Sequence, residues 1–212
     1  MEKTETEGLS IGAGMAGGNA INPESVKARA DSDFYPTPEP VTEALIRAER
    51  KHLSVFTHVW EPACGQGAMA KVIEREGYSV IGTDLVDRGY GEGGVDFMRC
   101  DTLKAPAIIT NPPYKDDLPE AFIMKAHTLG TVYLALLLKA QFFHTAGRYR
   151  LWNNFRPARE YKLTWRPDFL GLGGGTMDCS WWVWDWRGLN YSRTCQVELL
   201  RRPDPLNLEG AL

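Results

Sequence analysis

The stretch His58-Val59-Trp60-Glu61-Pro62-Ala63-Cys64-Gly65-Gln66-Gly67-Ala68-Met69-Ala70 changes character midway. Val59 and Trp60 predict the end of a short strand, and residues 68–76 have helical character. Gly65 and Gly67 between them permit a tight turn and close backbone approach. A strand, a glycine loop and a helix in this order are typical of α/β folds that bind nucleotide-like ligands. The dinucleotide pattern Gly-x-Gly-x-x-Gly is incomplete, because Ala70 replaces its third glycine, and the loop lacks a phosphate-binding lysine.

Two acids follow further along the chain. The run Tyr78–Leu85 predicts a second strand that ends at Asp84, about 20 residues after the glycine loop. A carboxylate in that position can accept hydrogen bonds from two ribose hydroxyls. Residues 95–98 indicate the approach to a third strand edge, after which Asp101 could accept from a ring amino group. A turn aspartate explains Asp101 nearly as well.

The tetrapeptide Asn111-Pro112-Pro113-Tyr114 comes directly after an apolar, β-branched run that predicts the end of a buried strand. Ligands bind at such strand ends in open parallel sheets. The amide oxygen of Asn111 and the carbonyl of Pro112 can both accept from an amino group, and Tyr114 offers a ring for stacking. The tetrapeptide therefore fits a planar molecule that bears an amine. A proline-stiffened turn with a capping asparagine is the alternative.

The remaining pattern completes an α/β fold with a mostly parallel sheet and helices on both faces. Residues 116–129 predict a helix, and the apolar run Thr131–Leu138 predicts a central strand covered on both faces. Trp181–Trp186 alternates as a last antiparallel hairpin would. Near the N-terminus, the segment Tyr35–Pro38 precedes a predicted helix from Val41, so the hydroxyl of Thr37 could either cap that helix or contact a ligand.

Length and composition suit one domain. The chain has 212 residues, of which 43% are hydrophobic and 24% charged, and we expect a folded domain over residues 33–202. Residues 1–32 are rich in glycine and alanine and predict a flexible tail, with a second tail at 203–212. No apolar run is long enough for a membrane span and no signal core is evident, so we expect a cytoplasmic protein without a membrane partner. The four cysteines are scattered, which predicts free thiols and no metal site.

Charge is unevenly distributed along the chain. Residues 1–138 hold 13 basic and 20 acidic side chains, whereas residues 139–202 hold 11 basic and 5 acidic ones. Such asymmetry indicates that the C-terminal part meets a polyanion, although a solvated basic surface would give the same count.

These motifs, in this order, resemble the S-adenosylmethionine-dependent amino-methyltransferases of DNA, in particular small, single-domain, phage-like members of the adenine-specific Asn-Pro-Pro-Tyr group. The resemblance covers roughly residues 33–186 and includes the ending Arg166-Pro167-Asp168-Phe169 with Trp182-Val183-Trp184-Asp185. It implies a Rossmann-like class I methyltransferase fold, S-adenosylmethionine as cofactor, and methyl transfer to the amino group of a flipped adenine, in restriction-modification or phage DNA modification.

The resemblance also assigns residues to roles. The catalytic residues are Asn111, Pro112, Pro113 and Tyr114. The cofactor-binding residues are Tyr35, Thr37, Glu61, Pro62, Ala63, Gly65, Gly67, Asp84, Leu85, Asp101 and Asn111. The substrate-binding residues are Tyr114, Lys139, Phe142 and Phe169, and the candidates for DNA phosphate contacts are Arg148, Arg150, Arg156, Arg159 and Lys162.

Alternatives remain open on the sequence. The same tetrapeptide serves enzymes that methylate cytosine amines, guanine in RNA or glutamine in proteins, and a non-catalytic nucleic-acid-binding protein could retain the fold. Only residues 143–175 could form a small target-recognition segment, so we expect a short recognition sequence or help from a partner subunit. The sequence does not determine the oligomeric state.

Overall fold

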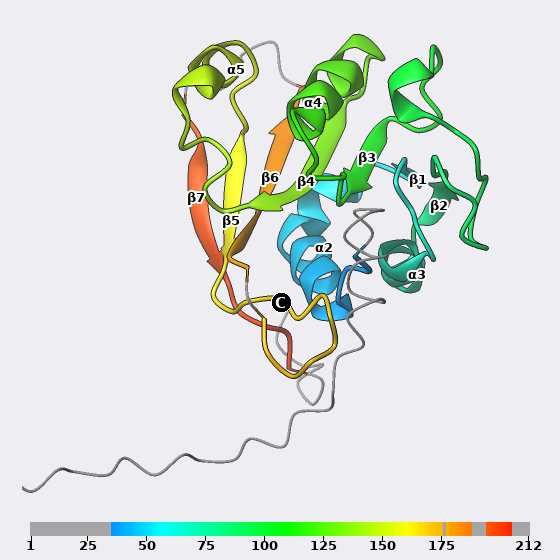
Figure 1. Cartoon of the computed structure of the whole chain (residues 1–212), viewed down its shortest axis with the longest axis horizontal. Coiled ribbons are helices and arrows are strands. Elements are labelled where there is room, and N and C mark those ends of the chain that lie inside the picture. Colours follow the sequence, from blue (N-terminus) through cyan, green and yellow to red (C-terminus); the bar gives the residue numbers. More distant parts are fainter. Residues whose placement is uncertain (1–34, 176, 188–193, 205–212) are drawn as a thin grey trace, which may run out of the picture. The chain divides into compact units, whose positions relative to one another are not determined.

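The computed structural model describes residues 35–175, 177–187 and 194–204. The predicted tail over residues 1–32 lies outside these ranges, as does most of the predicted tail over 203–212. In the described residues, seven strands form one sheet with the order β2-β1-β3-β4-β6-β5-β7 (Figure 1). The strands are β1 (His58–Glu61), β2 (Ser79–Gly82), β3 (Ala107–Thr110), β4 (Tyr133–Lys139), β5 (Arg159–Leu163), β6 (Cys179–Asp185) and β7 (Gln196–Leu200).

The sheet is mostly parallel. Strands β1 to β4 run parallel to one another, and β6 pairs antiparallel with both β4 and β5. The helices are α2 (Glu39–Leu53), α3 (Ala68–Arg75), α4 (Leu118–Thr128) and α5 (Tyr149–Asn154), with the short 3-10 turns η1 (Phe97–Arg99) and η2 (Ala146–Arg148). This arrangement confirms the predicted α/β fold and its antiparallel C-terminal part.

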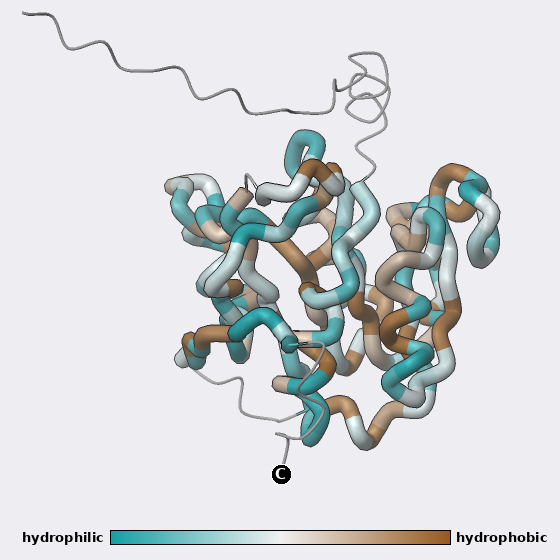
Figure 2. Tube along the Cα trace, turned by 90° about the horizontal axis from the view of Figure 1, so that it is seen from below, coloured by the Kyte–Doolittle hydropathy of each residue, from teal (hydrophilic) through white to brown (hydrophobic). Residues whose placement is uncertain are grey.

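The central strand β4 is covered on both faces, as its apolar run predicts. Its alternate residues enter two hydrophobic clusters, because successive side chains of a strand point to opposite faces. Tyr133, Ala135 and Leu137 pack with residues of α2 and α3, whereas Leu134, Leu136 and Leu138 pack with residues of α4 and α5. Figure 1 shows the two helix pairs on opposite sides of the sheet, and Figure 2 shows hydrophobic segments through the middle of the described chain.

Two elements differ from the sequence prediction. Residues 95–98 do not approach a strand; η1 forms there instead, and the side chain of Asp96 accepts from Met98 N at 2.9 Å. At the other edge of the sheet, β7 was not predicted, because its first four residues are all exposed and show no alternation of burial. It pairs in parallel with β5. Since β5 lies within the sheet, the segment 143–175 is partly sheet and partly the connections around it.

A buried ionic cluster ties α2 to the sheet. The carboxylate of Glu49 is fully buried and accepts from Tyr133 Oη at 3.1 Å and from Arg159 Nη2 at 2.9 Å. It also accepts from Tyr161 Oη. Burial, together with the nearby Glu49 carboxylate, raises the pKa of both tyrosines, so both phenols stay protonated as donors.

This cluster corrects one assignment from the sequence. The side chain of Arg159 is only 9% exposed and is directed at Glu49, so it does not contact DNA phosphates. The sequence could not show this, because Glu49 lies 110 residues away along the chain.

Candidate functional site

Three loops meet at one edge of the sheet. In the parallel pairing, Glu61 of β1 lies beside Gly82 of β2, and Trp60 lies beside Ile108 of β3. The loops that follow these strands therefore leave the sheet side by side, at the carboxyl edge where open α/β sheets bind ligands. They carry the glycine loop, Asp84 and the Asn111–Tyr114 tetrapeptide.

The glycine loop depends on both of its glycines. Gly65 and Gly67 have φ values of 54° and 77°, in the left-handed region that other residues rarely adopt. A Cβ atom on Gly67 would lie 2.4 Å from the ring of Tyr90. Gly67 is also the N-cap of α3, so the loop turns directly into the helix.

The acid after β2 is held against this loop. One carboxylate oxygen of Asp84 accepts from Gly65 N at 2.8 Å, and the other accepts from Val86 N at 2.9 Å. Each oxygen has a second lone pair, so Asp84 can still accept from two hydroxyls of a ligand. The structure thus brings Gly65, Gly67 and Asp84 together.

The other acid of this region, Glu61, is almost completely buried, with 3% of its surface exposed. Within the part of the chain that the structure describes, its Oε2 atom has no hydrogen-bond partner. Burial, with smaller contributions from the charges of Asp84 and Glu74, raises the pKa of Glu61 well above its ordinary value, although a hydrogen bond from the backbone of Ala70 opposes the shift. The raised pKa extends the protonated form of Glu61 to higher pH in the folded protein than in the unfolded chain.

This raised pKa makes stability depend on pH. The folded state holds its proton at pH values where the unfolded chain has lost it, so the free energy of unfolding falls as pH rises above the ordinary value of 4.5. The slope for one proton is at most about 1.4 kcal/mol per pH unit. Because Glu61→Gln cannot ionise, its stability relative to wild type should increase as the pH rises above about 4.5. Urea denaturation at several pH values measures this difference.

The control for that experiment is Glu92→Gln, which changes an exposed carboxylate of the loop after β2. A stability difference between Glu61→Gln and wild type that stays constant with pH would show that Glu61 is ionised in the folded protein.

The tetrapeptide Asn111–Tyr114 is anchored at two points. Asn111 Nδ2 donates to Thr37 Oγ1 at 3.2 Å, whereas Asn111 Oδ1 is buried and has no hydrogen-bond partner among the described residues. The hydroxyl of Tyr114 donates to Leu137 O at 3.0 Å, and Lys139 Nζ lies 5.7 Å from the centre of the Tyr114 ring. An amide oxygen that lacks a donor costs stability, so Asn111 Oδ1 is an acceptor available to a ligand amine.

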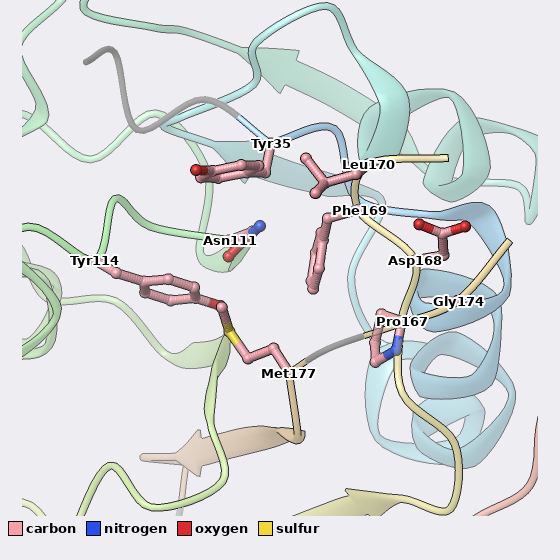
Figure 3. A pocket seen from close by; sticks show the side chains of 9 residues that line it. All are labelled: Tyr35, Asn111, Tyr114, Pro167, Asp168, Phe169, Leu170, Gly174 and Met177. Carbon is pink, nitrogen blue, oxygen red and sulfur yellow. The ribbon is translucent and has the colours of Figure 1, made fainter. Parts of the chain in front are cut away.

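Asn111 lies in the wall of a cavity of about 150 Å³ (Figure 3). The rings of Tyr35, Tyr114 and Phe169 surround its amide in that view. A cavity of about 150 Å³ is large enough to hold at least one aromatic ring. The lining residues are Tyr35, Asn111, Tyr114, Pro167, Asp168, Phe169, Leu170, Gly174 and Met177.

The loop between β5 and β6 supplies the wall opposite Asn111. Asp168 accepts from Leu172 N at 3.1 Å and from Gly173 N at 2.7 Å, and these backbone hydrogen bonds lower its pKa. A Cβ atom on Gly175 would lie 2.2 Å from Arg166 O, so only glycine fits where the loop closes. Sequence reasoning identified Phe169 but missed Leu170, Gly174 and Met177. The glycine run 171–175 was the available signal, because it marks a closely packed loop.

Some predicted site residues lie elsewhere. Phe142 does not line the cavity: it is buried in the core beneath the guanidinium of Arg148, which lies 4.1 Å from the ring centre. Leu85 and Asp101 are exposed, whereas Pro62, which precedes the glycine loop, is buried and Ala63 is half-buried. Tyr35, predicted to bind a cofactor, lies in the cavity wall, and Thr37 contacts Asn111.

The sequence matches no protein-family model and no curated protein. Solved structures do share the fold. A Listeria monocytogenes protein assigned as a class I S-adenosylmethionine-dependent methyltransferase aligns over 80% of this chain and 67% of its own, at 16% identity and a TM-score of 0.54. A Pyrococcus horikoshii protein assigned as an RNA methyltransferase aligns over 70% of this chain and 84% of its own, at 13% identity and a TM-score of 0.58.

A Vibrio vulnificus protein assigned as the modification subunit of a type I restriction enzyme aligns over 87% of this chain, at 14% identity and a TM-score of 0.54. The alignment covers 50% of that subunit, so this chain spans about half its length. The chain therefore has the Rossmann-like fold of class I methyltransferases.

Two further findings concern the described residues. Within residues 35–175, 177–187 and 194–204, no three side chains of histidine, cysteine, aspartate or glutamate gather as metal ligands would. In the same ranges, every helix is too short or too polar to cross a membrane.

Proposed function

We propose that the protein transfers a methyl group from S-adenosylmethionine to the exocyclic amino group of adenine in DNA, with the target base flipped into the cavity. The observation that carries this proposal is the unpartnered Oδ1 atom of Asn111 in the wall of an aromatic cavity. The class I fold and the adjacent glycine loop support the assignment of the methyl donor.

The glycine loop and Asp84, which lie together at the carboxyl edge of the sheet, fit this cofactor. The carboxylate of Asp84 has lone pairs left for the two ribose hydroxyls, and Gly65 and Gly67 allow the backbone to approach the ligand closely. We propose that the exposed Leu85 and Asp101 contact its adenine ring, and that Glu61 and the Pro62–Ala63 turn shape the loop beneath it. When bound, the cofactor supplies an electrophilic methyl group on a sulfonium centre.

The residues of the protein then have to align the amino group of the adenine with the methyl group of the cofactor and exclude water from the cavity. Asn111 Oδ1 and the carbonyl of Pro112 accept from the amine and direct its lone pair toward the methyl group. Tyr114, fixed through its hydroxyl to Leu137 O, and Phe169 hold the base between them. No strong base is needed, because the amine loses its proton after methyl transfer.

The charge of the C-terminal part supports DNA as the partner. Arg150 and Lys162 are exposed and remain our candidates for phosphate contacts. Lys139, whose Nζ lies near the Tyr114 ring, remains a proposed substrate-binding residue. Arg148 and Arg156 also pack on aromatic rings, those of Phe142 and Trp152, so part of their role is structural. We further propose that a partner subunit supplies recognition of a longer sequence, since this chain spans half of a restriction modification subunit.

Removal of the Asp84 carboxylate should weaken cofactor binding. Asp84→Ala is expected to cost about 1–3 kcal/mol of binding free energy through the lost charge-assisted hydrogen bonds. Titration calorimetry with S-adenosylmethionine measures it. Asp84→Asn, which retains one oxygen for Gly65 N, separates the charge from the support of the loop. An unchanged dissociation constant in Asp84→Ala would place the ribose elsewhere.

The acceptor is tested by transfer of a tritiated methyl group to DNA, RNA and protein in parallel, followed by identification of the modified nucleoside by mass spectrometry. N6-methyladenine in DNA is the expected product. N4-methylcytosine would support the mechanism but show that the target base is cytosine. Label found only in RNA or protein would overturn the proposed substrate. DNA binding without cofactor binding would indicate a non-catalytic protein.

A further inference from the structure

One side chain of the segment before α2, that of Thr37, contacts Asn111 of the Asn111–Tyr114 loop. Thr37 is 6% exposed, and its hydroxyl oxygen accepts from Asn111 Nδ2 at 3.2 Å across 74 residues of sequence. This is a side-chain contact inside the protein. The sequence offered Thr37 two other roles, as the cap of α2 and as a ligand of the cofactor.

The structure excludes the capping role. The N-cap of α2 is Pro38, and no side chain of the described residues caps this helix by a hydrogen bond. The chain enters the helix through prolines on both sides of Glu39, whose fixed φ angles favour a helix start without a cap. The hydroxyl of Thr37 is therefore not needed for the helix.

The direction of the hydrogen bond matters for Asn111. A side-chain amide has an accepting end and a donating end, and rotation by half a turn exchanges them. With Nδ2 donating to Thr37, the oxygen is the end that lacks a partner. Only that end can accept from an amine, because an amide NH₂ facing an amine would place two donors together.

We propose that Thr37 is a positioning residue that holds the Asn111 amide with its oxygen toward the acceptor amine. The inference deepens the proposed function and rests on it for the identity of the amine. It makes the segment before α2 part of the catalytic constellation and assigns to Thr37 a role through Asn111 instead of through the cofactor.

The test compares Thr37→Val, which keeps the shape and removes the hydroxyl, with Thr37→Ser, which keeps the hydroxyl. We expect Thr37→Val to lower kcat on DNA by up to about 100-fold, because small misplacement of a reacting group has costs of that order. Thr37→Ser should retain most of the wild-type kcat. The dissociation constant for S-adenosylmethionine should stay near wild type in both variants, and thermal melting confirms that both are folded. A weaker cofactor affinity in Thr37→Val with unchanged single-turnover rate would overturn the inference.

A second readout does not depend on activity. In ¹⁵N-labelled protein, the side-chain NH₂ signals of Asn111 are assigned by their loss in Asn111→Ala. Wild type and Thr37→Ser should show these protons protected from exchange with solvent, and Thr37→Val should lose the protection. Equal protection in wild type and Thr37→Val would show that Thr37 does not hold the amide. If the expected protection pattern accompanies an absence of methyl transfer to every acceptor, the proposed function fails while the positioning of Asn111 stands.

Discussion

Asn111→Ala is expected to lower methyl transfer to DNA by at least about 100-fold, the cost typical of removing one group that stabilises a developing charge. The substitution removes the amide oxygen that lies without a partner in the cavity wall, so the amine loses one of its two acceptors. Affinity for S-adenosylmethionine should stay near wild type, because the glycine loop and Asp84 follow other strands. Single-turnover rates and titration calorimetry measure the two effects separately.

The matched control is Asn153→Ala, which removes an exposed asparagine of α5 outside the cavity. It should leave both rate and affinity unchanged. Normal turnover by Asn111→Ala would remove Asn111 from the mechanism, and a parallel loss of cofactor affinity would show that the side chain mainly shapes the cofactor site.

Glu49→Ala is expected to destabilise the folded protein by about 3–5 kcal/mol, the cost of leaving a buried charge without its partner. Glu49 is fully buried and accepts from Arg159, Tyr133 and Tyr161, which come from two strands of the sheet. Its loss would leave the Arg159 guanidinium with Asp185, at 3.4 Å, as its remaining acidic partner. Such a change is a large fraction of the stability of a typical domain, about 5–15 kcal/mol.

Glu39→Ala on the same helix provides the comparison. Glu39 forms an exposed ion pair with Arg75 at 3.1 Å, and exposed pairs contribute only about 0–1 kcal/mol. Urea denaturation of both variants and wild type measures the two free energies of unfolding. Similar values for Glu39→Ala and Glu49→Ala would mean that solvent reaches the Glu49 cluster and screens its charge.

Local patterns predicted the elements that hold the site. The strand before Glu61, the turn at Gly65 and Gly67, and the helix α3 all follow from residue types over fewer than twenty positions. The same holds for the continuous apolar run that became β4 and for the position of Asn111 after β3. Glycine and proline restrict φ locally, and burial on both faces requires an unbroken apolar run, so neither feature depends on distant contacts.

The less regular parts were harder to predict. The edge strand β7 shows almost no buried face, and residues 95–98 form a short turn fixed by Asp96. The alternation of polar and apolar residues in β7 covers only residues 196–199, and all four are exposed, so periodicity carries little information there.

The sequence by itself determined the α/β fold class, the glycine loop after β1 and the position of the Asn111–Tyr114 loop after β3. The tertiary structure alone decided that Thr37 contacts Asn111, that the loop carrying Phe169 closes the cavity, and that Arg159 turns inward to Glu49 instead of outward to DNA. Each of these contacts joins residues more than fifty positions apart. They depend on the order in which strands pair, above all on β6 between β4 and β5, and strand order follows from packing over the whole sheet.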